Sequence, residues 1–187
     1  MPRDLESLPG ELPVPDDDGA ADHLPGAALP AVALPATRGP DVRLDRLARA
    51  VIYAYPRTGR PDEPPLVADW DRIPGARGCT PESCGFRDHH ADLAALGTDV
   101  FGVSTQTTDE QREAVERLRL PFLLLSDAEL ALARALELPT FAAGGHELLR
   151  RLTLVVRSGR VEHVFHPVFP PDRHAEEVLA WLRERPG

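Results

Sequence analysis

The sequence predicts an α/β fold in which a mixed central β-sheet is flanked by helices. Three observations predict it. Short apolar segments alternate with amphipathic segments that carry helix-capping residues, an order typical of a sheet covered by helices. The last two apolar segments flank Ser158-Gly159, a turn that joins antiparallel strands. The length of 187 residues suits one domain with a substantial core.

The N-terminal part of the chain divides into a tail and the start of the domain. Residues 1–25 are rich in Pro, Gly and Asp, which predicts a flexible acidic tail, and residues 26–187 should form the folded domain. The closely spaced prolines of residues 27–45 favour edge strands and turns. Residues 50–55 are apolar and predict a buried strand that ends at Pro56.

A proline-rich segment follows this strand. Residues 56–78 contain five prolines and exceed the usual length of a connection, so they predict an ordered, functional loop. Trp70 is expected to anchor it, because a buried aromatic ring holds irregular backbone in place. The loop ends next to Cys79.

Capping and turn residues set the remaining elements. Thr80 is the expected N-cap and Pro81 the first residue of a helix that runs to Leu96 and stops at Gly97. Thr107 with Glu110, or Thr108 with Gln111, matches a capping box. In chain order, the later elements are a strand at 100–104, a helix at 107–118, a strand at 122–125, a helix at 128–136, a hairpin at 152–156 and 161–165, and a helix from Asp172 to about Arg185.

The only two cysteines, Cys79 and Cys84, lie at the start of the first predicted helix. Unpaired backbone N–H groups and the positive end of the helix dipole favour a thiolate there. If both residues are helical, their Cα atoms are about 8–9 Å apart, beyond the ~7 Å that a disulfide tolerates. A Cys79–Cys84 disulfide therefore requires the first helical turn to unwind.

Two other interpretations of the cysteines remain open. Two cysteines are often simply small buried apolar residues. A metal site could join Cys79 and Cys84 to His89, but Cys84 and His89 are five residues apart and share a helix face poorly. No cofactor-binding or metal-ligating residue is assigned on this evidence.

Composition excludes several classes of function. The net charge of −9 argues against nucleic acid as a partner. All 21 basic residues are arginines, and the chain has no lysine. No apolar run reaches 18 residues, so no membrane-spanning helix is expected. The N-terminus lacks the basic and apolar blocks of a signal peptide, which favours a cytoplasmic protein whose thiol pair is redox-active.

Several blocks resemble the peroxiredoxins of the bacterioferritin-comigratory, or peroxiredoxin Q, type. The block G-C-T-P-E-S-C-G-F-R-D at residues 78–88 resembles their helix-start signature. Tyr55-Pro56 and residues 101–104 resemble their strands, and residues 151–156 with 159–165 resemble their arginine-bearing hairpin. The resemblance covers about residues 26–185 in colinear order. It implies a thioredoxin-like fold.

The resemblance also implies an activity, a thioredoxin-dependent peroxidase acting on hydrogen peroxide or organic hydroperoxides. Cys79 would be the peroxidatic cysteine, Cys84 the resolving cysteine and Arg151 the arginine that stabilises thiolate and peroxide. Oxidation would yield a sulfenic acid at Cys79, which Cys84 converts to a disulfide. Thioredoxin or a similar dithiol would then reduce this disulfide. The expected oligomeric state is a monomer or a homodimer.

The chain departs from the family pattern just before Cys79. The family has a hydroxyl residue three positions before the cysteine and a proline seven positions before it; here these are Ala76 and Arg72. An insertion of about fifteen residues after Pro56 accounts for the mismatch. Thr58 or Thr80 could restore the hydroxyl.

Two arginines near the cysteines each allow two interpretations. Arg77 could stabilise charge at the thiol or be a solvated loop residue. Arg87 could act on the site or form a surface salt bridge with Asp88 or Glu82.

Two alternative functions keep the fold and change the chemistry. A redox-sensing or regulatory protein would oxidise but turn over slowly, since Ala76 lacks a hydroxyl. A non-catalytic thioredoxin-fold binding module would carry an unreactive Cys79.

Overall fold

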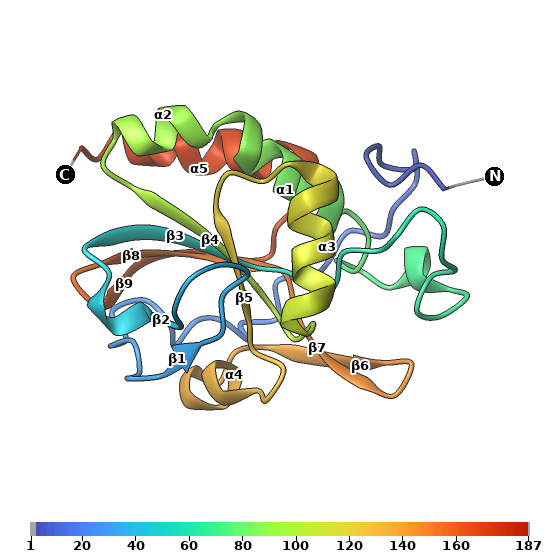
Figure 1. Ribbon diagram of the computed structural model, residues 1–187, viewed down its shortest axis with the longest axis horizontal. Helices are drawn as coiled ribbons and strands as arrows, with labels where there is room; N and C mark the ends of the chain where they lie inside the picture. Colours follow the sequence, from blue (N-terminus) through green and yellow to red (C-terminus); the bar gives the residue numbers. More distant parts are fainter. Residues whose placement is uncertain (1–2, 187) are drawn as a thin grey trace.

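The computed structural model describes residues 3–186 and centres on a five-stranded mixed sheet of order β5-β4-β3-β8-β9 (Figure 1). Strands β3, β4 and β5 are parallel, whereas β8 runs antiparallel to β3 and to β9. Their bounds are β3 Arg49–Ala54, β4 Asp99–Ser104, β5 Leu123–Ser126, β8 Leu152–Arg157 and β9 Arg160–Phe165. This architecture confirms the predicted thioredoxin-like α/β fold.

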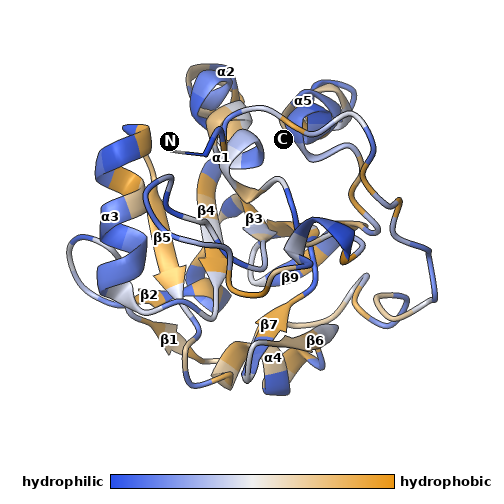
Figure 2. Cartoon of the chain, turned by 90° about the vertical axis from the view of Figure 1, so that its right-hand side faces the viewer, coloured by the Kyte–Doolittle hydropathy of each residue, from blue (hydrophilic) through white to orange (hydrophobic). Residues whose placement is uncertain are grey.

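Alternate residues of β3 divide the core into two layers. Val51 and Tyr53 face a cluster formed with α1, α2, α3 and α5, while Ile52 and Ala54 face a second cluster on the opposite side. The helices of the first layer are α1 Cys79–Asp88, α2 His90–Ala95, α3 Thr108–Leu118 and α5 His174–Arg183. The second layer contains α4 Ala131–Leu136 with the short strands β1 Ala33–Leu34 and β2 Val42–Arg43. In Figure 2 the sheet is mostly apolar and the helices turn polar sides outward.

Most predicted elements form within a few residues of their expected bounds. The capping box of Thr107 and Glu110 is present, and Gly97 takes a left-handed conformation (φ +64°) after α2. The predicted loop anchor Trp70 is buried against a small cluster that includes Phe141. The β8–β9 hairpin turns at Ser158-Gly159 as predicted.

The prediction of one continuous helix from Thr80 to Leu96 is wrong in two respects, its first residue and its lack of a break. Gly78, with φ +109°, is the N-cap and Cys79 the first helical residue, so Thr80 and Pro81 lie inside the first turn. Only glycine fits at position 78, because a Cβ there would meet the Pro171 side chain at 2.3 Å. At His89 the helix breaks into α1 and α2.

Two further corrections lie in the C-terminal half. Asp172 does not cap α5; it belongs to a 3-10 turn at Pro171–Arg173, and α5 begins at His174. A hairpin of β6 Thr140–Ala143 and β7 His146–Leu149 was not predicted. Its turn is Gly144-Gly145, both at positive φ, which was the available signal.

The N-terminal segment lies against the domain. Leu5, Ala21 and Leu24 are buried, and the Arg150 guanidinium contacts the Asp18 carboxylate at 2.6 Å. Figure 1 shows the start of this segment beside the loop that precedes α1. The division into a flexible tail and a domain stays a prediction, but residues 3–25 follow the surface of the fold.

Among residues 3–186, no helix is both long and apolar enough to cross a membrane.

Gly102, in the middle of β4, tests the packing between the sheet and the first helical layer. A Cβ at this position would lie 2.5 Å from Leu124 and 2.7 Å from the Tyr53 ring. We expect Gly102→Ala to lower the free energy of unfolding by about 1–3 kcal/mol, the usual cost of overpacking a core. Urea denaturation measures it. Gly10→Ala is the control, since nothing lies within 4 Å of its Cβ position, and a loss as large as that of Gly102→Ala would contradict this account.

Candidate active site

The turn at Gly78 positions Cys79 at the start of α1. The left-handed Gly78 directs the chain from the long loop into α1, and the first helical hydrogen bond runs from Glu82 N–H to the Gly78 carbonyl (3.1 Å). The backbone N–H groups of Cys79 and Thr80 therefore lie at the open end of the helix, where they can serve an external acceptor. Cys79 itself is only 3% exposed.

Arg151 lies directly beside the thiol. It precedes β8, which pairs with β3, so the loops at the ends of these two strands meet. Its Nη2 lies 3.2 Å from Cys79 Sγ, and the guanidinium is almost fully buried. Sγ is also 3.6 Å from the Ala76 carbonyl, to which a thiol can donate. The structure thus brings together Cys79 and Arg151, as predicted from the sequence.

Glu82 is the second partner of Arg151. Its carboxylate, completely buried in the first turn of α1, pairs with Arg151 Nη1. Burial raises the pKa of Glu82, while Arg151 and His174 act to lower it. Burial acts to lower the pKa of Arg151, but Cys79 and Glu82 outweigh it and raise the pKa. The guanidinium therefore stays charged next to the thiol.

Arg151 also fixes the backbone that leads to Cys79. Its Nη2 group lies within 3.2–3.4 Å of the carbonyl oxygens of Gly75, Ala76 and Arg77. One side chain thus touches the thiol, a carboxylate and three consecutive residues of the loop. The position of Cys79 relative to its positive partner is set by this single buried group.

Cys79 opens into a pocket of about 540 Å³. Its floor includes Gly78, Cys79 and Thr80, and its far wall is the proline-rich loop with Trp70. The remaining lining residues come from the N-terminal segment, the rest of that loop and the start of α3: Arg3, Leu5, Arg57, Thr58, Gly59, Arg60, Glu63, Pro64, Pro65, Leu66, Arg77, Gln106, Asp109, Glu110 and Glu113. The insertion therefore loops out from the sheet and forms a pocket wall.

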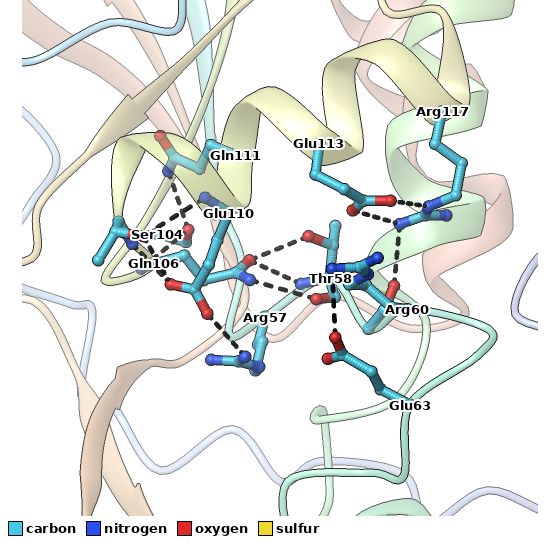
Figure 3. Close-up of polar contacts among 12 residues, drawn as sticks. Arg57, Thr58, Arg60, Glu63, Ser104, Gln106, Glu110, Gln111, Glu113 and Arg117 are labelled. Atoms are coloured by element: carbon cyan, nitrogen blue, oxygen red, sulfur yellow. Dashed lines mark hydrogen bonds and ion pairs between the residues drawn. The ribbon is translucent and has the colours of Figure 1, made fainter.

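A polar network ties this wall to α3 (Figure 3). The backbone N–H and hydroxyl of Thr58 donate to Gln106 Oε1 at 2.9 and 3.0 Å, and Gln106 Nε2 donates back to the Thr58 carbonyl at 3.2 Å. Arg57 pairs with Glu110 at 2.7 Å, and Arg117 donates to the Gly59 carbonyl at 2.9 Å. The loop is thus held in one conformation along α3.

The family hydroxyl has no counterpart at Ala76, which is fully buried beside Trp70. Both sequence candidates for its replacement line the pocket with Cys79. The Thr58 hydroxyl is engaged with Gln106, whereas Thr80 directly follows Cys79 on the pocket floor. Of the two, Thr80 is the better placed to serve a ligand at the thiol.

Cys84 is half-buried on α1, and neither cysteine forms a disulfide. It lies five positions after Cys79 on the same helix, about 8–9 Å between Cα atoms, so the two thiols are not poised to bond. Burial raises the pKa of Cys84, which favours its thiol form. The site is therefore asymmetric: Arg151 contacts the Cys79 sulfur directly, whereas Arg87 and Arg117 oppose the raised pKa of Cys84 without outweighing its burial.

Arg77 and Arg87 make their side-chain hydrogen bonds away from the Cys79 thiol. Arg77 donates to the carbonyls of Asp4 and Ser7 at 2.7 and 3.2 Å, so it binds the N-terminal segment rather than solvent, and it lines the same pocket as Cys79. Arg87 pairs with Asp88 at 2.8 Å, whereas Glu82, the other partner that the sequence allowed, pairs with Arg151. The charge of Arg87 also acts to lower the pKa of Cys84.

Sequence reasoning missed several residues of the site. It named Glu82 only as a possible surface partner of Arg87, whereas Glu82 is buried and pairs with Arg151. No local signal in the sequence marks Leu5 or Gln106, because both reach the pocket only through packing between distant segments. In residues 3–186, no group of three or more His, Cys, Asp or Glu side chains is arranged to hold a metal ion.

The fold and its thiols define the class of the protein, a thiol oxidoreductase with a thioredoxin-like fold. The chain belongs to the Redoxin family, whose model matches residues 24–179. Its relatives within that family are peroxiredoxins of the bacterioferritin-comigratory and Q type, which confirms the resemblance seen in the sequence.

Three relatives illustrate the extent of the match. Peroxiredoxin Bcp of Escherichia coli is 28% identical over 85% of this chain and 95% of its own length. Chloroplastic peroxiredoxin Q of Gentiana triflora is 29% identical over 96% of this chain and 78% of its own. The crystal structure of peroxidoxin BcpB from Mycobacterium tuberculosis superposes with a TM-score of 0.69 at 27% identity, covering 88% of this chain and 99% of that one.

Removing Arg151 tests how much the site depends on the buried pair. We expect Arg151→Met to lower the free energy of unfolding by about 3–5 kcal/mol, because it leaves the Glu82 charge buried and unpaired. Adding Glu82→Met should recover most of this loss. Urea denaturation at pH 7 measures both. The matched control is Arg157→Met, whose partner Glu162 is on the surface, with an expected loss of at most about 1 kcal/mol.

The same variant should show a pH dependence of defined sign. Burial raises the pKa of Glu82 and Arg151 opposes that rise, so without Arg151 the folded protein holds the Glu82 proton to higher pH. Stability is then retained at low pH and lost as pH rises through the folded-state pKa. If the stability loss of Arg151→Met relative to the wild type instead grew as the pH was lowered, the assigned role of Glu82 would be refuted.

Proposed function

We propose that the protein is a two-cysteine peroxidase in which Cys79 reduces hydroperoxides. The observation that carries this is the 3.2 Å contact between Arg151 Nη2 and Cys79 Sγ at the floor of the pocket. A positive charge at that distance stabilises a thiolate, the nucleophilic form of cysteine. The peroxiredoxins among the relatives support the reaction class.

In the chemical step, Cys79 attacks one oxygen of the O–O bond. An S–O bond forms as the O–O bond breaks, the sulfur is oxidised to a sulfenic acid, and the departing oxygen takes a proton and leaves as water or an alcohol. Negative charge moves onto this oxygen in the transition state. Arg151 and the free N–H groups at the start of α1 are the donors available to receive it.

Cys84 then resolves the sulfenic acid. Its thiol condenses with Cys79, an S–S bond forms and water is released. Since both residues belong to α1, the first helical turn has to unwind before the sulfur atoms meet. A dithiol protein such as thioredoxin would then reduce the disulfide by exchange. The proposal includes a cytoplasmic location, a monomeric or homodimeric state, and the division at residue 26.

The regulatory alternative rests on Ala76, which supplies no hydroxyl to the bound peroxide. Loss of one preorganised donor elsewhere costs a factor of about 10² to 10³ in rate. A protein slowed to that extent would act as a redox sensor, so the rate of Cys79 oxidation decides between the two functions.

Stopped-flow oxidation of the reduced protein by peroxide tests the roles of the two cysteines. Oxidation should be several orders of magnitude faster than that of a free thiol and should vanish in Cys79→Ser. Cys84→Ser should oxidise at the same initial rate and stop at sulfenic acid, trapped by dimedone and seen by mass spectrometry. A wild-type rate equal to that of a free thiol would instead favour the regulatory or binding function.

Far-UV circular dichroism tests the unwinding of α1. The oxidised wild type should lose helix relative to the reduced protein, because the Cys79–Cys84 disulfide cannot form on intact helix. Cys84→Ser, treated with the same peroxide, should keep its full helix signal. An unchanged spectrum after complete disulfide formation would refute the unwinding.

A further inference from the structure

We propose that Leu5, in the N-terminal segment, is a specificity-determining residue that holds the organic part of a hydroperoxide in the pocket above Cys79. The proposal rests on the function proposed above. Leu5 precedes the part of the chain that matches the family model, which starts at residue 24. The site would then be completed by a segment outside the family domain.

The N-terminal segment is fixed to the pocket wall by Arg3. Its backbone N–H donates to the Pro61 carbonyl at 2.9 Å, and its guanidinium donates to the carbonyls of Arg60 and Glu63 at 2.8–3.3 Å. On the other side of Leu5, Arg77 donates to the Asp4 and Ser7 carbonyls. Leu5 is thus held from both sides.

Leu5 faces inward although its neighbours are exposed. It is 6% exposed, and its Cδ1 lies 3.4 Å from the position that a Cβ on Gly59 would take. It shares the pocket lining with Leu66 and Trp70 of the long loop and with Cys79. An apolar surface from two separate segments therefore surrounds the space in front of the thiol.

The charged groups of the pocket are largely paired with each other. Arg57 contacts Glu110 at 2.7 Å, and Arg60 contacts Glu63 at 3.2 Å. The two other lining carboxylates contact arginines of α3: Glu113 contacts Arg117 at 2.7 Å and Asp109 contacts Arg112 at 2.8 Å. With these charges neutralised in pairs, the apolar part of the lining, which includes Leu5, Leu66 and Trp70, is available to an uncharged organic group.

The size of the pocket points the same way. Its 540 Å³ falls within the range of about 300–1,000 Å³ typical of sites for small organic molecules. A water molecule takes up only about 30 Å³, and hydrogen peroxide is little larger. A hydroperoxide with an aromatic or branched alkyl group would fill the space and keep its O–O bond at Cys79.

Stopped-flow oxidation of the full-length chain by cumene hydroperoxide and by hydrogen peroxide tests the proposal. The wild-type rate should saturate with cumene hydroperoxide and stay linear with hydrogen peroxide. Leu5→Ala should lower the second-order rate constant for cumene hydroperoxide by roughly 10-fold or more, since a single methylene group in an apolar pocket is worth about that much. It should leave the hydrogen peroxide rate within about twofold.

Two further variants distinguish a direct contact of Leu5 with the substrate from a general effect on folding. Leu5→Met, which keeps the apolar volume, should restore the cumene hydroperoxide rate, and Val14→Ala, in the same segment but 63% exposed, should change neither rate. Equal changes of both rates in Leu5→Ala, or no change in either, would overturn the proposal. Failure of the wild type to react with any peroxide would overturn the proposed function, and this inference with it.

Discussion

The buried guanidinium of Arg151 is the interaction on which the site depends. It contacts the Cys79 thiol, the Glu82 carboxylate and three carbonyls of the loop before α1. A charge taken out of water is costly unless it is paired and hydrogen-bonded, and both terminal nitrogens of Arg151 meet this need while its Nε has no partner. The need to satisfy Arg151 therefore fixes the loop, the start of α1 and the thiol at once, so stability and chemistry are coupled through one side chain.

Sequence patterns predicted the parts of the fold that follow from local rules. The alternation of strands and helices, the Thr107 capping box and the Ser158-Gly159 turn are encoded within a few residues. The start of α1 was misplaced because Thr80 is a strong local cap, whereas the packing of Pro171 against Gly78 decides the boundary. Cys79 was singled out by its position at a helix start, whereas Arg151 was found through a family resemblance. Glu82 and Leu5 depend on contacts between distant segments, which spacing along the chain does not reveal.

The insertion after Pro56 turns a departure from the family pattern into a structural element. It replaces the usual short approach to the cysteine with a wall that the Thr58–Gln106 pair and Arg117 hold against α3. The wall in turn binds the N-terminal segment through Arg3. The start of the N-terminal segment is thus held against the loop by hydrogen bonds from Arg3 to three loop carbonyls.

The interruption of the helix at His89 has a mechanical consequence. Because α1 and α2 are separate short helices, a helix unwinding that starts at Cys79 can extend over at most the ten residues of α1. Beyond the break, Leu93 remains buried in the main core and α2 stays packed on β4. The break at His89 therefore separates the helix that carries Cys79 from the helix packed on the sheet. An unwinding of the first turn of α1, as proposed for the Cys79–Cys84 disulfide, would then leave α2 and the sheet in place.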